Sequence, residues 1–448
     1  MEKITLNKLS QTQKLILDEV DNKKVIGSGT GIGKSITALY VAEKHNHKSV
    51  LVIVPKMLRD LKTWEIDHSK TSIDIELLVL SKEDFKKQSP DLKRFDLVVL
   101  DEAGEWLLSG MRPELKAKHS NPKIDTSAIF ASVMNYINRV EPSEIIMLDA
   151  TVAAGKPLSL FAAKTILKMT GETKQEIVDN HQAFVSKFYH EIPMGYSSRW
   201  KEKTVPSRYS SKDILESSQA ELKRLWQEIA VFVDDDRKIK PIETDVPVII
   251  DIEHKQKLKQ IEKDFAGGSV HSRLFAYESG HFKDMAFDDI NHKMWIEEQH
   301  TVTAKEIAII EFVSFLPKQV IIFSTFTAQQ NHLKGLLRQN GIVSEIINGT
   351  TSTEERAVLV SEFRKGNLQI LIIQSSICAG YNMPECDTII RASSPIKAAH
   401  LTQQYGRIDR APNYKQNYIY NFYHVGGKDE DALIRTRNGE DLNYELYD

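Results

Sequence analysis

The chain has 448 residues, of which 41% are hydrophobic and 27% charged, and its formal net charge is −3. That length predicts about three domain-sized units, and no apolar run approaches the roughly 18 residues of a membrane-spanning helix. Two cysteines, Cys378 and Cys386, are too few for a disulfide framework or a four-cysteine zinc site. With no apolar stretch near the N-terminus to suggest secretion, we expect a cytoplasmic protein with reduced thiols. Any surface for nucleic acid must be a local patch, because the net charge is small.

The first 165 residues alternate between helix-like and strand-like segments. Helices are expected over residues 10–21, 34–45 and 56–66, and another opens at Ser81, whose side chain can cap it. Short apolar strands are expected at residues 24–26, 49–54, 75–80, 97–100 and 145–148. Such strands, separated by helices, predict a parallel sheet that is buried on both faces.

The same alternation restarts near Gln319 and predicts a second α/β unit. Its strands are expected at residues 320–324, 343–347, 368–374, 388–391 and 418–422. Its helices are expected over residues 327–340 and 352–365, with a third that runs through Gln404.

The segment between the two α/β halves is polar and rich in Lys, Glu, His and aromatic residues. It shows no strand–helix period, and helices are expected only at residues 212–233 and 253–265. The spacing of its histidines fits no zinc pattern (His271, His281, His292 and His300). The chain is therefore expected to divide into a first α/β domain (1–168), an accessory region (169–305) and a second α/β domain (306–448).

The sharpest local signal is a glycine-rich loop between the first strand and the helix that begins at Lys34. Glycines let successive backbone N–H groups point at a phosphate, and the helix N-terminus adds partial positive charge. Lys34 can reach the β- and γ-phosphates of ATP, and the Ser35 hydroxyl can ligate Mg²⁺. The strict pattern has Gly where this chain has Ser28, and an ordinary glycine-rich turn is the alternative. The predicted phosphate-binding residues are Ser28, Gly29, Thr30, Gly31, Ile32, Gly33, Lys34 and Ser35.

Two carboxylates, Asp101 and Glu102, directly follow the apolar strand at residues 97–100. At the carboxyl end of a parallel strand they would face the ligand crevice. Asp101 can hold Mg²⁺ through its water shell, and Glu102 can orient and deprotonate an attacking water. The alternative is a solvated acidic turn.

Two arginines, Arg407 and Arg410, lie three residues apart in the sequence Gln403-Gln404-Tyr405-Gly406-Arg407-Ile408-Asp409-Arg410. Arginine keeps its charge and offers a planar fork to a γ-phosphate. We expect these residues to assist ATP hydrolysis as arginine fingers, and a surface helix end with ordinary ion pairs is the alternative.

In this order, the motifs resemble those of superfamily 2 helicases and translocases, in particular the Swi/Snf-type and phage branch-migration group. Leu9 to Gln13 is similar to the element that reads adenine, which makes Gln13 the candidate residue. Val52 to Leu58, followed by Trp64, is similar to a DNA-tracking motif. The likeness covers roughly residues 1–165 and 318–425, and it implies tandem RecA-like domains. The further similar segments are Leu148-Asp149-Ala150-Thr151, Ile321 to Ser324, Asn348-Gly349-Thr350 and Ser375 to Asn382.

Three positions depart from the family pattern. Gly104 stands where His is usual, Asp149 where Ser or Thr is usual, and Asp409 where His or Gly is usual. These three departures affect the route that couples hydrolysis to movement, whereas the residues of the ATPase chemistry are all present.

Contacts to nucleic acid are expected from polar residues at strand ends and in the middle region. Lys56 and Arg59 follow the strand at residues 49–54. In the middle region, Trp200 and Arg208 belong to a stretch of interleaved bases and aromatics that suits stacking and phosphate contact. Solvated loops are the alternative in each case. The candidates in the second domain are Thr325, Thr350 and Ser376.

The sequence therefore predicts an ATP- and Mg²⁺-dependent DNA helicase or translocase that unwinds or branch-migrates forked or junction DNA, acting as a cytoplasmic monomer. One alternative is a duplex translocase that remodels protein–DNA complexes without unwinding, and another is an RNA helicase. A third, from a different class, is a non-motor nucleic-acid-binding protein with a vestigial ATP site.

Overall fold

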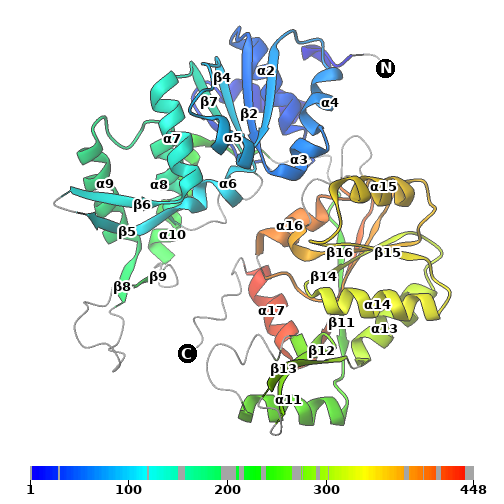
Figure 1. Ribbon diagram of the computed structural model, residues 1–448. Helices are drawn as coiled ribbons and strands as arrows, with labels where there is room; N and C mark the ends of the chain where they lie inside the picture. The colour runs from blue at the N-terminus through cyan, green and yellow to red at the C-terminus, as the bar shows by residue number, and fades with distance from the viewer. Residues whose placement is uncertain are drawn as a thin grey trace, which may run out of the picture. The chain divides into compact units, whose positions relative to one another are not determined.

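The computed structural model divides into two compact units, Met1–Asp235 and Asp236–Asp448, each built on its own sheet (Figure 1). Within the described residues, no helix is both long and apolar enough to cross a membrane. The structure describes residues 3–28, 31–118, 121–149, 157–192, 208–210, 216–233, 239–264, 274, 276–288, 293–300, 302–377, 383–396, 398–409 and 415–438.

The first unit contains a six-stranded sheet in the order β10-β1-β7-β4-β2-β3, and all of its strand pairs are parallel. Alternate residues of β2 and β4 pack into hydrophobic clusters on opposite faces, Leu51 and Val98 on one, Val50 and Val99 on the other. This two-sided burial explains the near-continuous apolar strands. The strands are β1 (Val25–Ile26), β2 (Ser49–Val54), β3 (Glu76–Ser81), β4 (Leu97–Asp101), β7 (Glu144–Leu148) and β10 (Ala230–Val231).

Several helices of the first unit begin at a residue whose side chain caps them. Ser10 and Gln13 form a reciprocal capping box at the start of α1, and the Ser81 side chain accepts from the backbone N–H of Asp84. The helices are α1 (Gln11–Glu19), α2 (Lys34–Lys44), α3 (Lys56–Asp60), α4 (Thr63–Ser69), α5 (Lys82–Gln88), α6 (Ala103–Trp106), α7 (Ala128–Val140), α8 (Pro157–Ile166), α9 (Lys174–Phe188) and α10 (Glu216–Ile229). Two antiparallel hairpins accompany them, β5 (Met111–Lys118) with β6 (Asn121–Thr126) and β8 (His190–Ile192) with β9 (Arg208–Ser210).

The second unit repeats this plan, with a parallel six-stranded sheet in the order β11-β18-β17-β14-β16-β15. Its strands are β11 (Ile242–Val248), β14 (Val320–Ser324), β15 (Ser344–Ile347), β16 (Ile370–Gln374), β17 (Thr388–Arg391) and β18 (Tyr418–His424). Its main helices are α11 (Ile252–Asp264), α13 (Ala304–Ser314), α14 (Thr327–Gln339), α15 (Thr353–Arg364), α16 (Ala398–Tyr405) and α17 (Lys428–Arg437), and β12 (His281–Asp288) pairs with β13 (Lys293–His300).

The two parallel sheets confirm the predicted α/β class with tandem RecA-like units. Two predicted helices have different bounds in the structure. The one over residues 56–66 is divided into α3 and α4, because Lys62 has a left-handed φ of 50°. The one over residues 212–233 ends at Ile229, where the chain enters the edge strand β10.

The segment at residues 169–305, expected as an accessory region, contributes a strand to each sheet. β10 pairs with β1 in the first unit, and β11 pairs with β18 in the second. These pairings join residues more than 170 positions apart, so no local pattern could indicate them. The three-part division itself stays a prediction.

Candidate nucleotide site

The glycine-rich loop lies between β1 and α2, at the carboxyl edge of the first sheet. Gly31 and Gly33 have φ values of +84° and +79°, in the left-handed region that favours glycine. A Cβ on Gly33 would lie 2.6 Å from the Gln13 Nε2, so the Gln13 side chain would have to move, and the positive φ would strain any other residue. Gly29 and Thr30 lie outside the described residues.

Ser28 anchors the loop to the neighbouring edge strand. Its hydroxyl accepts from the backbone N–H of Val233 at 2.9 Å and contacts the carbonyl of Val231 at 3.3 Å. The Ser28 carbonyl accepts from the Lys34 ammonium at 2.9 Å. Serine in place of the usual glycine therefore ties the loop to β10 and its continuation, a contact that glycine could not make.

The remaining loop candidates surround the start of α2. Ile32 is buried in the hydrophobic core, whereas Lys34 and Ser35 are half-buried in the first helical turn. Gln13 donates from Nε2 to the carbonyl of Gly33 at 3.4 Å. The structure therefore brings the predicted adenine reader to the phosphate loop.

Asp101 ends β4 and is buried, with 7% of its surface exposed. Its Oδ2 accepts from the Trp64 indole N–H at 2.9 Å, and its Oδ1 accepts from the backbone N–H of Glu102 at 3.0 Å. A second indole, that of Trp106, donates to the Asp101 carbonyl at 2.8 Å. These contacts fix the carboxylate in one orientation.

Burial raises the pKa of Asp101, while the Trp64 hydrogen bond and the positive charge of Lys34 oppose that rise. The influence of Lys34 shows that the phosphate-loop lysine and the acidic turn share one electrostatic environment. Oxygen donors of Asp101 and Ser35 are of the kind that Mg²⁺ prefers, so the residues present fit the predicted ion.

Glu102 has a left-handed backbone, with φ of 50° and ψ of 41°. This conformation is uncommon for a residue with a side chain. The Trp64 indole holds the Asp101 carboxylate, and Glu102 directly precedes the short helix α6.

Asp149, one residue beyond the end of β7, is buried, with 1% of its surface exposed, and contacts the acidic turn directly. Its carboxylate accepts from the backbone N–H of Gly104. A Cβ on Gly104 would lie 2.3 Å from the Asp149 Oδ2. The two departures from the family pattern are therefore spatially linked, because Asp149 occupies the place of a side chain at position 104.

Three contributors to this site were not recognised as such in the sequence. Trp64 was expected to follow a DNA-tracking motif. It has no exposed surface, and its indole N–H donates to the Asp101 carboxylate instead. Trp106 and the Gly104–Asp149 contact were also missed. Trp106 follows the acidic pair by only a few residues, and this closeness could have indicated its contact with Asp101. No local pattern in the sequence connects Trp64 with Asp101.

In the second unit, Arg407 lies just after α16 and is buried, with 3% of its surface exposed. Its Nε donates to the carbonyl of Gln403 at 2.8 Å, and its own carbonyl accepts from the backbone N–H of Met383 at 2.9 Å. Arg410 lies outside the described residues. The predicted role of both arginines stays a prediction.

The nucleic-acid candidates of the second unit gather at one sheet edge. Thr325, Thr350 and Ser376 follow the carboxyl ends of β14, β15 and β16, which are neighbours in the sheet. Thr325 donates from Oγ1 to the carbonyl of Ser394 at 2.7 Å, while Thr350 and Ser376 are exposed. The structure thus places three expected contacts along one edge.

The nucleic-acid candidates of the first unit differ in whether their side chains already form ion pairs within the protein. Lys56 is exposed at the start of α3. Arg59 already pairs with Asp60 at 2.7 Å and with Asp84 at 3.2 Å, so a phosphate would have to compete with two carboxylates. Arg208 lies in β9, and Trp200 lies outside the described residues.

Cys386 is buried, and burial raises the pKa of its thiol to about 12. It is therefore an unreactive core residue, and Cys378 lies outside the described residues.

Comparison with known proteins identifies part of the second unit. Residues 304–412 match the helicase conserved C-terminal domain. This range begins at α13 and includes β14 to β17 with α16, so part of the second unit is similar to that domain.

Two relatives extend the similarity. An uncharacterized ATP-dependent helicase of Bacillus subtilis, YqhH, is 23% identical over 450 residues, which covers 93% of this chain and 74% of the relative. The ATP-dependent RNA helicase DBP3 of Kluyveromyces lactis is 25% identical over 124 residues, 27% of this chain and 24% of the relative. The DBP3 similarity is thus confined to a short part of both proteins.

A solved structure has the same fold over almost the whole chain. Dbp5 of Saccharomyces cerevisiae, bound to RNA and ADP BeF₃, aligns with a TM-score of 0.51 at 12% identity, covering 98% of this chain and 89% of that one. At this identity the likeness concerns the fold alone.

Proposed function

We propose that this chain is an ATP- and Mg²⁺-dependent motor that moves on DNA and unwinds or branch-migrates forked or junction substrates. The observation that carries the proposal is the first unit's carboxyl edge, where a glycine loop, Lys34 and the indole-held Asp101 meet. The helicase C-terminal domain in the second unit supports the same function.

Each residue of the site has a role in this proposal. The loop from Ser28 to Ser35 binds the phosphates, with Lys34 as their charge partner. Ser35 and Asp101 hold Mg²⁺, which offsets phosphate charge when it is bound. Glu102 accepts the proton of the attacking water. Gln13 reads the adenine, and Arg407 and Arg410 stabilise the charge that develops on the transferred phosphoryl group.

The proposed nucleic-acid contacts are the residues at the sheet edge of the second unit together with Lys56 and Arg59. Hydroxyls and cations at strand ends suit phosphate contact with little base readout. Trp200 and Arg208 of the middle region would add stacking and charge. The proposed setting is the cytoplasm, and the proposed form is a monomer.

RNA is a second candidate substrate, and the names of similar proteins favour it. DBP3 is an RNA helicase, and Dbp5 has been solved with RNA. The preference for DNA comes from the resemblance of the segment at Val52 to Leu58 to Swi/Snf-type proteins. A duplex translocase that does not unwind is a third candidate, since the same site would drive it.

Strand displacement and ATP hydrolysis, measured together, test the proposal. Purified protein would be given forked, Holliday-junction and plain duplex substrates, each as DNA and as RNA, with ATP and Mg²⁺. We expect unwinding of forked or junction DNA and hydrolysis that the same DNA stimulates, with Lys34→Ala inactive in both assays.

The other outcomes identify the alternatives. DNA-stimulated hydrolysis without strand displacement would indicate a duplex translocase, and selective unwinding of RNA forks would indicate an RNA helicase. Binding of nucleic acid with no hydrolysis above the Lys34→Ala background would contradict the motor and leave a binding protein with a vestigial ATP site.

A further inference from the structure

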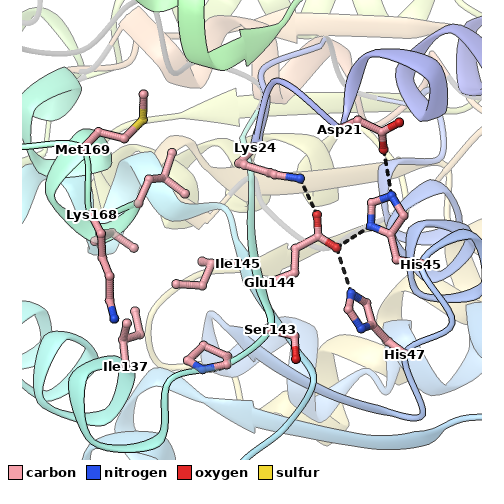
Figure 2. A pocket seen from close by; sticks show the side chains of 13 residues that line it. Asp21, Lys24, His45, His47, Ile137, Ser143, Glu144, Ile145, Lys168 and Met169 are labelled. Carbon is pink, nitrogen blue, oxygen red and sulfur yellow. Dashed lines mark hydrogen bonds and ion pairs between the residues drawn. The ribbon is translucent and has the colours of Figure 1, made fainter.

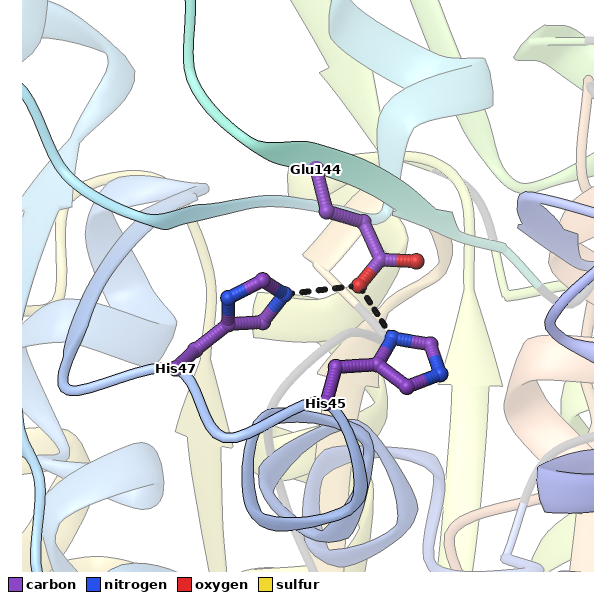
Figure 3. A group of neighbouring side chains, drawn as sticks. All are labelled: His45, His47 and Glu144. Carbon is purple, nitrogen blue, oxygen red and sulfur yellow. Dashed lines mark hydrogen bonds and ion pairs between the residues drawn. The ribbon is translucent and has the colours of Figure 1, made fainter.

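A cluster of two histidines and a glutamate lies at the amino edge of the first sheet, at the opposite end of the strands from the nucleotide site. His45 caps the end of α2, His47 precedes β2, and Glu144 is the first residue of β7. Figure 3 shows the three side chains converging on one point. Neither the family resemblance nor the proposed ATPase chemistry uses these residues.

The two imidazoles contact the same oxygen of the Glu144 carboxylate. Glu144 Oε2 lies 2.6 Å from His45 Nδ1 and 2.9 Å from His47 Nε2. Its other oxygen, Oε1, accepts from the Lys24 ammonium at 2.6 Å. One ligand atom from each of His45, His47 and Glu144 lies within 4.8 Å of the others.

His45 is held between two carboxylates, because its Nε2 lies 2.7 Å from Asp21 Oδ1 (Figure 2). A neutral imidazole carries one N–H, and an ionised carboxylate only accepts. A neutral His45 can therefore donate to only one of the two carboxylates. At the other contact the lone pair of the ring nitrogen would face a lone pair of the carboxylate oxygen. A cation between these two atoms, either a metal ion or a proton, removes that repulsion. The negative end of α2, at the same place, also favours a cation.

We propose that His45, His47 and Glu144 bind a Zn²⁺ ion through Nδ1, Nε2 and Oε2. Two imidazoles and one carboxylate are donors that suit zinc, whereas Mg²⁺ and Ca²⁺ take oxygen donors. The Asp21 carboxylate at the far side of His45 completes a carboxylate–histidine–metal arrangement, which fixes the ring and makes it a better ligand. Water supplies the fourth position.

The geometry requires a small adjustment. Ligand atoms about 2.1 Å from a tetrahedral ion lie about 3.4 Å apart, so the two contacts to Glu144 Oε2 widen slightly when the ion enters. Lys24 and Lys44 already balance the charges of Glu144 and Asp21, which limits the affinity. We therefore expect binding in the micromolar range rather than that of a tightly held structural zinc.

An entry path exists from the adjoining cavity. The cavity has a volume of about 500 Å³, and Asp21, Lys24, His45, His47 and Glu144 all line it. The ion would fasten the end of α2 to β7, and α2 begins at the phosphate loop. The site would therefore stabilise the helix that positions Lys34.

Calorimetry on the full chain tests this site. Tag-free protein, freed of metal with a chelator and without nucleotide, would be titrated with Zn²⁺ near neutral pH. We expect one ion per chain and a rise in melting temperature that a chelator reverses. Co²⁺ in place of Zn²⁺ should give the visible absorption of a four-coordinate ion, and Mg²⁺ should give neither effect.

Two variants make the test specific. His47→Gln keeps an N–H donor for Glu144 but loses the zinc ligand, so it should fold normally and bind Zn²⁺ at least about tenfold more weakly. Asp21→Asn should weaken binding by roughly 10–100-fold, because it replaces the charged partner of His45 with a neutral amide. His68→Gln is the control, since His68 on α4 lies outside the cluster and its ring hydrogen-bonds to the backbone carbonyl of Ile73 at 3.0 Å.

Zinc binding by His47→Gln equal to that of the parent would overturn the assignment. So would the absence of binding by the parent, which would leave a network of ion pairs in which a proton occupies the place of the metal.

Discussion

Asp101 is the residue whose surroundings say most about the candidate site. A carboxylate that is both buried and held by an indole cannot reorient to follow a moving ligand. Its neighbour Glu102 is half-buried and has a left-handed backbone. The two adjacent carboxylates therefore differ in burial, as the separate roles proposed for them in metal binding and proton transfer would require.

Glu102→Gln should retain ATP binding and lose turnover, because a carboxamide cannot accept the proton of the attacking water. The expected loss in kcat is on the order of 10²–10⁴. Nucleotide affinity and single-turnover hydrolysis, measured on the same preparation, separate the two effects. Near-normal turnover would remove Glu102 from the role of base.

Gly104→Ala should destabilise the first unit, because its Cβ would lie 2.3 Å from the Asp149 carboxylate. Overpacking of this kind costs roughly 1–3 kcal/mol. In the double variant with Asp149→Ala the clash is gone, so the combined loss should be smaller than the sum of the single losses.

Thermal unfolding of the parent, the two single variants and the double variant measures the coupling between positions 104 and 149. Gly335→Ala in α14 is the control, because its Cβ would meet nothing within 4 Å and the helix should gain up to about 1 kcal/mol. Strictly additive losses at positions 104 and 149 would show that the two departures from the family pattern are independent.

At the scale of elements, the N-terminus of α17 is held by a buried acidic residue from far away in the chain. Glu278 accepts from the backbone N–H groups of Lys428 and Asp429 at 2.8 and 2.9 Å. Asp429 in turn pairs with Lys305, whose ammonium lies 2.6 Å away and is fully buried. This group joins α13 and α17 in the core of the second unit.

Burial and the neighbouring charge of Asp429 raise the pKa of Glu278 to about 8. The folded chain therefore keeps a proton that the unfolded chain, with an ordinary glutamate pKa, releases at a lower pH. The stability that this proton supplies is complete below about pH 4.5 and declines as the pH rises through about 8.

Glu278→Gln should therefore flatten the pH dependence, because a carboxamide stays neutral across this range. Between pH 5.5 and 8.5 the parent should lose roughly 1–3 kcal/mol more than the variant. Amide exchange in α17 reports the effect locally. Glu345→Gln, at a half-exposed ion pair with Lys334, is the control, and equal pH profiles for parent and Glu278→Gln would contradict the shifted pKa.

At the scale of the whole molecule, separating two strands requires an obstacle in addition to a motor. The stretch from Trp200 to Tyr209 combines aromatic and basic residues that could act as such a wedge. A brace between the elements of the motor is the alternative role for this stretch.

The triple variant of Trp200, Arg208 and Tyr209 to alanine distinguishes the two roles. A wedge predicts DNA-stimulated ATP hydrolysis near the parent's level with impaired fork unwinding. A brace predicts that hydrolysis, unwinding and melting temperature fall together. Equal unwinding by variant and parent would exclude a wedge in this stretch.

The sequence alone determined the repeating strands and helices and the position of the glycine-rich loop. Apolar runs such as residues 97–100 and caps such as Ser81 act within a few residues, so their outcome is visible locally. The strand at residues 49–54 and the start of α2 at Lys34 were predicted as found.

Only the tertiary structure decided which distant residues share a site. Trp64 and Asp101 are 37 positions apart, His47 and Glu144 are 97 apart, and Ser28 meets a strand more than 200 residues later. Parallel strands bring such residues to one edge through crossover connections, whose order depends on packing rather than on local pattern. Asp101 was a candidate from the sequence, whereas the contact of Trp64 with it and the cluster of His47 and Glu144 arise from the order of strands in the sheet.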